Sequence, residues 1–532
     1  MNKTLYFNAH VYTANPALPY AEAFAVENGR ISFIGFEHSD IFSDDSYQKV
    51  DLKCAFVLPG FTDAHAHALD GQLWVGPGDM SSRQSVTEIC DGIREVAANT
   101  EAGEWVFVSG ANLPLFGAYP TRELLDQLVP DQPLLVVNFD VHSAALNSKG
   151  LEKAGISRST EAPAGGVYER DASGEPTGVV HEAGLYKIFP QLKQMSPARF
   201  PAAIRQATSM GHEIGVTGWF EARVDLNMLK AYHQAEIDGE LKTYVSAGLL
   251  AVNHRNLAEQ IAEFSRWKTQ YEGELLKVHT VKVFIDGVTE SRTASLLAPY
   301  AGLTDAGEPH WSQAELNEVC ELADNAGFDL HFHTLGDRAA HMALNAIEYA
   351  KHRNPKRERR IQLAHLQLVA DQDKPRFREL GAIASVQGLW CAAPPEQKAF
   401  YASLLGAERA EKSYPLRSLK NAGALLAGGS DWPITTMNPF AIMQCATTRQ
   451  LDANDDPWNA AEILDLQSMM EAHTHNAAYA LRFDGFAGSL AVGKDATFLI
   501  TDQNPFHADL HQLGSIKVNA TYFKGERVYL RM

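Results

Sequence analysis

The chain has 532 residues, of which 45% are hydrophobic and 21% are charged, so it can bury a large core with smaller additions. Its formal charge of −19, from 46 Lys and Arg against 65 Asp and Glu, argues against broad binding to nucleic acids or anionic membranes, which requires a basic surface. The five cysteines form no CxxC pair or disulfide framework, and no segment resembles a signal peptide or a membrane span, so a cytoplasmic protein is expected.

Short strands with turns are predicted at both ends of the chain. Residues 1–57 contain three such runs, one of them a hairpin around Asn28-Gly29, and the C-terminal residues have the same pattern. Because the termini of a domain usually lie close together, we expect residues 1–58 and 486–532 to form one small β-sandwich domain. Two unrelated β-extensions are the alternative.

Residues 59–485 alternate between short apolar strands and helical segments, which is the signature of parallel βα units. Eight such units make a (β/α)8 barrel, so a TIM barrel of the α/β class is predicted. The strand candidates are 55–65, 215–220, 242–250, 278–286, 327–333, 360–366, 381–387 and 424–431.

The connection after the first barrel strand is far longer than the 2–6 residues typical of a βα loop. This stretch, about 70–215, contains strands and helices of its own. It predicts an inserted subdomain that follows the C-terminal end of a strand and overhangs the active face.

The motif PGFTDAHAHALD contains His65 and His67. Residues two apart on a strand share a face, so both imidazoles are predicted to project together, and imidazole is the commonest metal ligand at neutral pH. Alone, HxH is a weak motif, and two histidines packed at a strand end are an equal alternative.

Lys282 lies inside the apolar strand VHTVKVFID. An interior lysine is costly unless its charge is removed or paired. Carbamylation by carbon dioxide would convert it into a carboxylate able to bridge two metals, and a snorkelling or salt-bridged lysine is the alternative.

Three further candidates end later strands: His333 in GFDLHFHTLGD, His365 in RIQLAHL and Asp431 in LLAGGSDWP. His331 shares a face with His333 but lies deeper, so it is expected in the core or behind the ligands. Asp431 could also be a helix N-cap. Taken together, the candidates fall at the C-terminal ends of five barrel strands, where such enzymes place their chemistry.

With these motifs the chain resembles the amidohydrolase superfamily, in the amidohydrolase family 3 branch that includes N-substituted formamide deformylase. The resemblance rests on VLPGFTDAHAH, HSAALNSKGLEKAGI, VKVFIDGVTESRTA, HTLGDRA, RIQLAHLQLV, GGSDWP and GSLAVGKDATFLITD. It implies two divalent metals, usually zinc. It also implies a role for each candidate ligand: His65, His67 and Asp431 for the inner metal, His333 and His365 for the outer metal, and carbamylated Lys282 as the bridge.

The implied activity is hydrolysis of an amide or N-substituted formamide-like C–N bond by metal-activated hydroxide, with Asp431 moving the proton. A mononuclear deaminase or cyclic-amide hydrolase of the same superfamily is the alternative, and a non-catalytic scaffold is a third. The expected partner is a small-molecule substrate rather than nucleic acid or membrane, and a homodimer is the commonest soluble assembly.

Six residues are weaker candidates for substrate contact. For His142 the alternative is a local turn, and for Asp286 and Arg292 it is an ion pair. The aromatic residues could form a pocket wall. They are His142, Asp286, Arg292, Trp219, Gln387 and Trp390.

Overall fold

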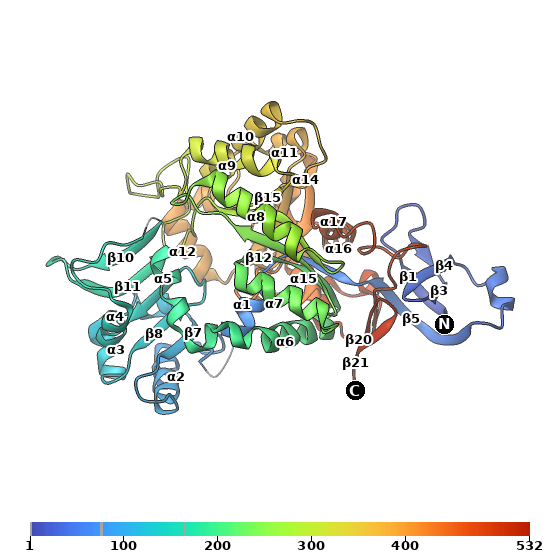
Figure 1. The fold of residues 1–532 in the computed structure, drawn as a ribbon, viewed down its shortest axis with the longest axis horizontal. Coiled ribbons are helices and arrows are strands. Elements are labelled where there is room, and N and C mark those ends of the chain that lie inside the picture. Colours follow the sequence, from blue (N-terminus) through green and yellow to red (C-terminus); the bar gives the residue numbers. More distant parts are fainter. Residues whose placement is uncertain (1–2, 75–77, 164) are drawn as a thin grey trace. The chain divides into compact units, whose positions relative to one another are not determined.

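The computed structural model describes residues 3–74, 78–163 and 165–532 (Figure 1). The chain divides into two compact units, one formed by Met1–Ala68 with Ile204–Met532 and the other by Leu69–Ala203. Within the described ranges, no helix is both long and apolar enough to cross a membrane.

Eight parallel strands form the barrel of the first unit, and their order in the sheet follows the chain. They are β6 (Phe61–Ala66), β12 (Val216–Val224), β13 (Tyr244–Leu250), β14 (Leu276–Phe284), β15 (Asp329–Thr334), β16 (Gln362–His365), β17 (Ile383–Val386) and β18 (Leu425–Gly428). The two ends of the sheet meet where the Asp431 N–H donates to the His65 carbonyl at 2.7 Å and the His67 N–H donates to the Trp432 carbonyl at 2.8 Å. The predicted (β/α)8 barrel is therefore confirmed.

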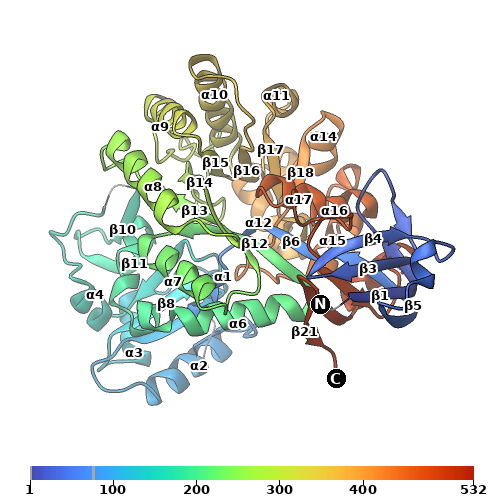
Figure 2. The ribbon, with the colours of Figure 1, turned by 45° about the vertical axis from the view of Figure 1, so that its right-hand side comes forward.

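Helices lie along the outside of strands β13 to β18 (Figure 2). These helices are amphipathic, and their sequences carry local signals for capping and close packing. For example, α9 starts with a capping box in which Ser312 and Glu315 satisfy each other's backbone N–H groups, and α10 buries a row of alanines that allows close packing. These outer helices are α8 (Leu257–Tyr271), α9 (Gln313–Asn325), α10 (Asp337–Arg353), α11 (Lys374–Leu380) and α14 (Leu416–Asn421).

Both ends of the chain contribute to one additional eight-stranded β-sheet, with the order β21-β20-β19-β5-β1-β3-β4 and β2 paired to β1. Its strands are β1 (Lys3–Tyr12), β2 (Tyr20–Ala21), β3 (Ala23–Glu27), β4 (Arg30–Gly35), β5 (Gln48–Pro59), β19 (Phe498–Thr501), β20 (Val518–Phe523) and β21 (Glu526–Leu530). Because β5 bonds to β1 on one side and β19 on the other, strands from both ends of the chain form one continuous sheet.

The additional β-domain continues directly into the barrel. Only Gly60 separates β5 from β6, and a Cβ atom at this position would lie 2.3 Å from the Thr217 hydroxyl oxygen. The absence of a side chain therefore lets the chain pass from one sheet into the other beside β12.

The second unit has its own five-stranded sheet and its own core. The sheet order is β10-β11-β9-β8-β7, and α2 (Val86–Ala98), α3 (Arg122–Leu128) and α4 (Ser148–Ala154) accompany it. Its strands are β7 (Val106–Ala111), β8 (Leu134–Asn138), β9 (Ser143–Leu146), β10 (Gly166–Arg170) and β11 (Pro176–Glu182). The unit ends before the predicted residue 215, because most of α6 (Phe200–Glu213) belongs to the barrel unit, where Gly211 faces Trp219.

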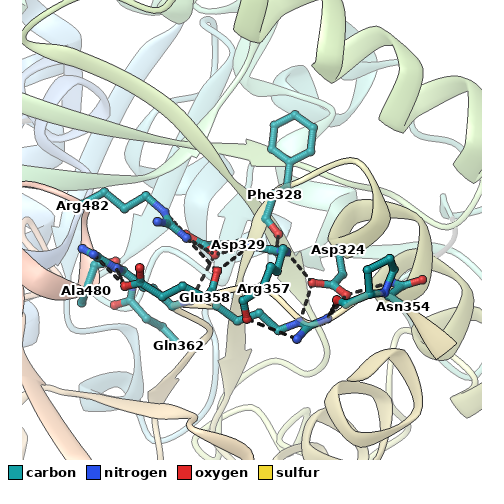
Figure 3. Close-up of polar contacts among 12 residues, drawn as sticks. Asp324, Phe328, Asp329, Asn354, Arg357, Glu358, Gln362, Ala480 and Arg482 are labelled. Atoms are coloured by element: carbon teal, nitrogen blue, oxygen red, sulfur yellow. Dashed lines mark hydrogen bonds and ion pairs between the residues drawn. The ribbon is translucent and has the colours of Figure 1, made fainter. Parts of the chain in front are cut away.

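A buried ion network surrounds Asp324 and Asp329 (Figure 3). Asp329, the first residue of β15, pairs with Arg482 at 2.6 Å and with Arg357 at 3.3 Å. Asp324, near the end of α9, pairs with Arg357 at 2.8 Å and with Arg359 at 2.7 Å. Both carboxylates are only 2% exposed. Their ion pairs join α9, β15 and the segment before β16 at the N-terminal face of the barrel, which serves stability.

Candidate metal centre

The strand β6 and the turn after β18 place His65 and Asp431 together. One oxygen of Asp63 accepts hydrogen bonds from the backbone N–H groups of His65 and Ser430, each at 3.0 Å. A Cβ atom at Gly429 would lie 2.7 Å from the His65 nitrogen, so this close approach requires glycine. A single buried carboxylate therefore sets the spacing of the two segments.

Four predicted metal ligands converge at the C-terminal end of the barrel. Asp431 Oδ1 lies 3.3 Å from His65 Nε2 and 3.4 Å from His67 Nε2. His65, His365 and Asp431 each offer one ligand atom within 4.8 Å of the others, and all three are buried. Imidazole nitrogens and a carboxylate oxygen at these positions fit a divalent metal such as zinc.

His333 joins this group through His365, because their ring centroids are 4.4 Å apart. His365 and Asp431 have backbone φ angles of 77° and 55°. These left-handed conformations are uncommon for residues with a side chain and cluster at functional sites, where the surrounding structure enforces them. The barrel thus holds two of the candidate ligands in strained positions.

Lys282 is fully buried in β14 and lies opposite His331 of β15 in the strand register. Its Nζ atom lies 4.7 Å from the centre of the Phe284 ring and has no hydrogen-bond partner among the described residues. Lys282 also forms no ion pair with any described residue, so the structure does not support the alternative of a salt-bridged lysine. Burial lowers the pKa of the amine to about 7, which makes an uncharged, nucleophilic amine available near neutral pH.

The electrostatics of the centre favour a neutral His65 imidazole beside a charged Asp431 carboxylate. Burial and the nearby Lys282 lower the pKa of His65 to about 3. Burial alone would raise the pKa of Asp431, but His65, His67 and His365 hold it well below its usual value. Both groups are therefore in the protonation state that binds a cation.

Two side chains orient the candidate histidines from behind. His331, which stacks on Phe220 with ring centroids 4.3 Å apart, contacts His65 Nδ1 through its Nε2 at 2.8 Å, in agreement with its expected position behind the ligands. Asp286 lies 3.2 Å from His333 Nδ1 and is fully buried. The predicted substrate contact by Asp286 is therefore replaced by an orienting contact, because the carboxylate has no exposed surface.

The aromatic candidates separate into one at the site and one outside the barrel. Trp390 is half-buried and stacks on His365 with ring centroids 5.1 Å apart and planes 7° apart. Trp219 is fully buried and faces Gly211 of α6. The predicted pocket wall is wrong for Trp219, because alternate residues of a strand face opposite sides and Phe220 takes the inner one.

The other weak candidates have diverse positions. Gln387 is buried after β17, and its amide atoms have no hydrogen-bond partner among the residues described. Arg292 is exposed in the loop after β14. His142 belongs to the Leu69–Ala203 unit, where its Nδ1 lies 2.8 Å from Glu182 Oε2.

Sequence reasoning missed Asp63, which the structure identifies as the residue linking the two ligand segments. A signal was present, since Asp63 lies two residues before His65 and shares its face of the strand. Its second partner, the Ser430 N–H, lies 367 residues away and has no local signal.

Comparison with known proteins finds one family and full-length relatives. The sequence model of the amidohydrolase family matches residues 48–529. The chain is 29% identical to Protein LONG AFTER FAR-RED 3 of Arabidopsis thaliana, over 98% of this chain and 91% of that protein. It is 26% identical to N-substituted formamide deformylase of Arthrobacter pascens, over 100% and 99% of the two chains. A solved structure of an uncharacterized metal-dependent hydrolase from Pyrococcus horikoshii shares the fold, with 22% identity, a TM-score of 0.76, and coverage of 96% of this chain and 99% of that one.

Proposed function

The chain belongs to the amidohydrolase family, and we propose that it hydrolyses a C–N bond of an amide or N-substituted formamide-like small molecule with the help of two divalent metals. The observation that carries the proposal is the buried group of His65, His365 and Asp431, whose ligand atoms lie within 4.8 Å of one another. A relative that matches over nearly the whole chain is an N-substituted formamide deformylase, which supports this substrate class.

The residues divide into two ligand sets with one bridge. His65, His67 and Asp431 would hold one ion, and His333 with His365 would hold the second. Lys282 would bridge them after carbamylation, in which its uncharged amine attacks carbon dioxide, forms an N–C bond and releases a proton. Burial without an ion pair within the described ranges supports this reaction. Zinc is the expected metal because nitrogen and oxygen ligands of this kind suit it.

When bound, such ions would lower the pKa of a water molecule and polarise the substrate carbonyl. The chain's own contribution is proton movement and orientation. Asp431 Oδ1, next to both His65 and His67, accepts a proton from the attacking water and delivers it to the leaving nitrogen. Trp390, which stacks on His365, would form one wall of the substrate pocket.

The test measures metal content and hydrolysis on the same preparation. We expect close to two divalent ions per chain and amine release from an N-alkylformamide. His365→Ala should lose metal and activity. His341→Ala should keep both, because His341 lies on the outer helix α10, where it pairs with Asp373 of the segment before α11. One ion with ammonia release from a purine nucleoside would favour the mononuclear deaminase, and no ion with no hydrolysis would favour a non-catalytic scaffold.

A further inference from the structure

One carboxylate lies directly behind the candidate ligands and is not part of the metal set. Asp286 follows β14, and both of its oxygens are used in hydrogen bonds. Oδ1 accepts from the Leu335 N–H at 3.1 Å and lies 3.2 Å from His333 Nδ1. Oδ2 accepts from the N–H groups of Ser295 at 3.0 Å and Gly336 at 2.8 Å.

These contacts decide which nitrogen of His333 carries the proton. An ionised carboxylate only accepts hydrogen bonds, and three backbone donors stabilise its ionised form. His333 must therefore donate through Nδ1–H, which leaves the lone pair of a neutral ring on Nε2. That is the nitrogen a metal would need.

The same carboxylate joins two loops. Ser295 belongs to the loop after β14, whereas Leu335 and Gly336 lead from β15 into α10. The loops touch so closely that a Cβ atom at Gly336 would lie 1.8 Å from the Ser295 carbonyl oxygen. Asp286 thus lies at the junction of the strand that carries Lys282 and the strand that carries His333.

We infer that Asp286 is a positioning residue that holds His333 in its metal-binding tautomer and keeps the loops after β14 and β15 in register. This inference rests on the proposed function for the identity of the ligands. Hydrogen bonds of this kind from a ligand histidine to a carboxylate orient the ring and raise its basicity.

The first test needs no variant and no metal. Nitrogen-15 NMR of the metal-free protein, with labelled histidine and His333 assigned from the His333→Gln spectrum, reports which ring nitrogen carries the proton. We expect a protonated Nδ1 and a bare Nε2. A proton on Nε2 would overturn the inference, even for a protein that binds no metal.

The second test uses Asp286→Asn, which keeps the shape of the side chain but replaces one acceptor by an NH2 donor. If the amide oxygen keeps the Ser295 and Gly336 N–H groups, its NH2 faces His333, which must then accept at Nδ1 and protonate Nε2. Titration with Co2+ should show one of two sites weakened by about 10–100-fold, as for loss of other carboxylate partners, and the other site unchanged.

The matched control is Asp305→Asn. Asp305 is an exposed residue of the same loop region whose carboxylate accepts from the Gly307 N–H at 3.0 Å, and its variant should bind Co2+ like the parent. Two unweakened sites in Asp286→Asn would refute the positioning role. A parent protein that binds no Co2+ would instead refute the proposed function and leave the NMR measurement to decide the role of Asp286.

Discussion

Replacing Asp329 by asparagine tests how far the buried ion network stabilises the barrel. Asp329 is 2% exposed and receives Arg482 through Nε at 2.6 Å and Nη2 at 3.0 Å, Arg357 at 3.3 Å and the Arg360 N–H at 3.1 Å. The amide keeps the volume but removes the charge, so the Arg482 guanidinium loses its carboxylate.

The expected loss follows from the burial of the partners. Removing one member of a buried ion pair costs roughly 3–5 kcal/mol. The Arg482 side chain is 25% exposed and the Arg357 side chain is 23% exposed, so water solvates part of the released charge. Arg357 also keeps Asp324. We therefore expect the lower end of that range, about 3 kcal/mol.

Urea unfolding of the metal-free protein, followed by circular dichroism, measures this loss as a lower midpoint. Glu408→Gln is the control, because Glu408 forms an ion pair with Lys412 at 2.8 Å in which both side chains are mostly exposed, and such pairs contribute little. An Asp329→Asn midpoint equal to that of the parent would show that hydrophobic packing alone holds the start of β15 and would refute the argument.

Three further predictions concern the metal centre and the response to pH. Asp431→Asn should lower turnover by about 100-fold or more, the usual range for loss of general acid–base catalysis. Circular dichroism should show that the variant keeps the native fold. Turnover at the parent rate would contradict the role of Asp431 in proton transfer. Lys282→Ala should lose activity and regain part of it with added short carboxylates, and the parent should give a carbamate 13C NMR signal in labelled bicarbonate that the variant lacks. Burial lowers the pKa of His212 from 6.5 to about 4, so below pH 6.5 the unfolded chain binds a proton that the folded chain excludes. His212 should therefore contribute about 3 kcal/mol to the fall in stability between pH 6.5 and 4. Thermal unfolding should show a shallower fall in His212→Gln, whose amide can still donate to the Lys242 carbonyl.

The barrel could be predicted because its information is local. Each strand is a short apolar run, each helix has an amphipathic face, and the candidate ligands end consecutive strands, so the parallel order alone brings them to one end. The terminal β-domain was predictable for the same reason, since both ends of the chain carry the alternation and turn residues of strands.

The errors arise where a side chain's neighbour is distant in sequence. The position near a strand end predicts Trp219 in the pocket, but Phe220 takes the inner face, where it stacks on His331 of β15, and this contact has no local signal. The sequence predicts Asp286 as a substrate contact and gives no sign of its partner His333, which lies 47 residues away. The left-handed backbone of His365 also has no signal in its own sequence, because the surrounding turn imposes it.

The pairing of β5 with β19 has a consequence during synthesis. Pro59 lies opposite Phe498 in this pairing, so roughly 440 residues must be added before the edge of β5 is covered, about 20–90 s at common rates of translation. Throughout that time the nascent chain presents an open strand edge, which is a template for association with other chains. A ribosome that stalls before residue 498 leaves β5 without its antiparallel neighbour, even though every candidate ligand from His65 to Asp431 has already been made.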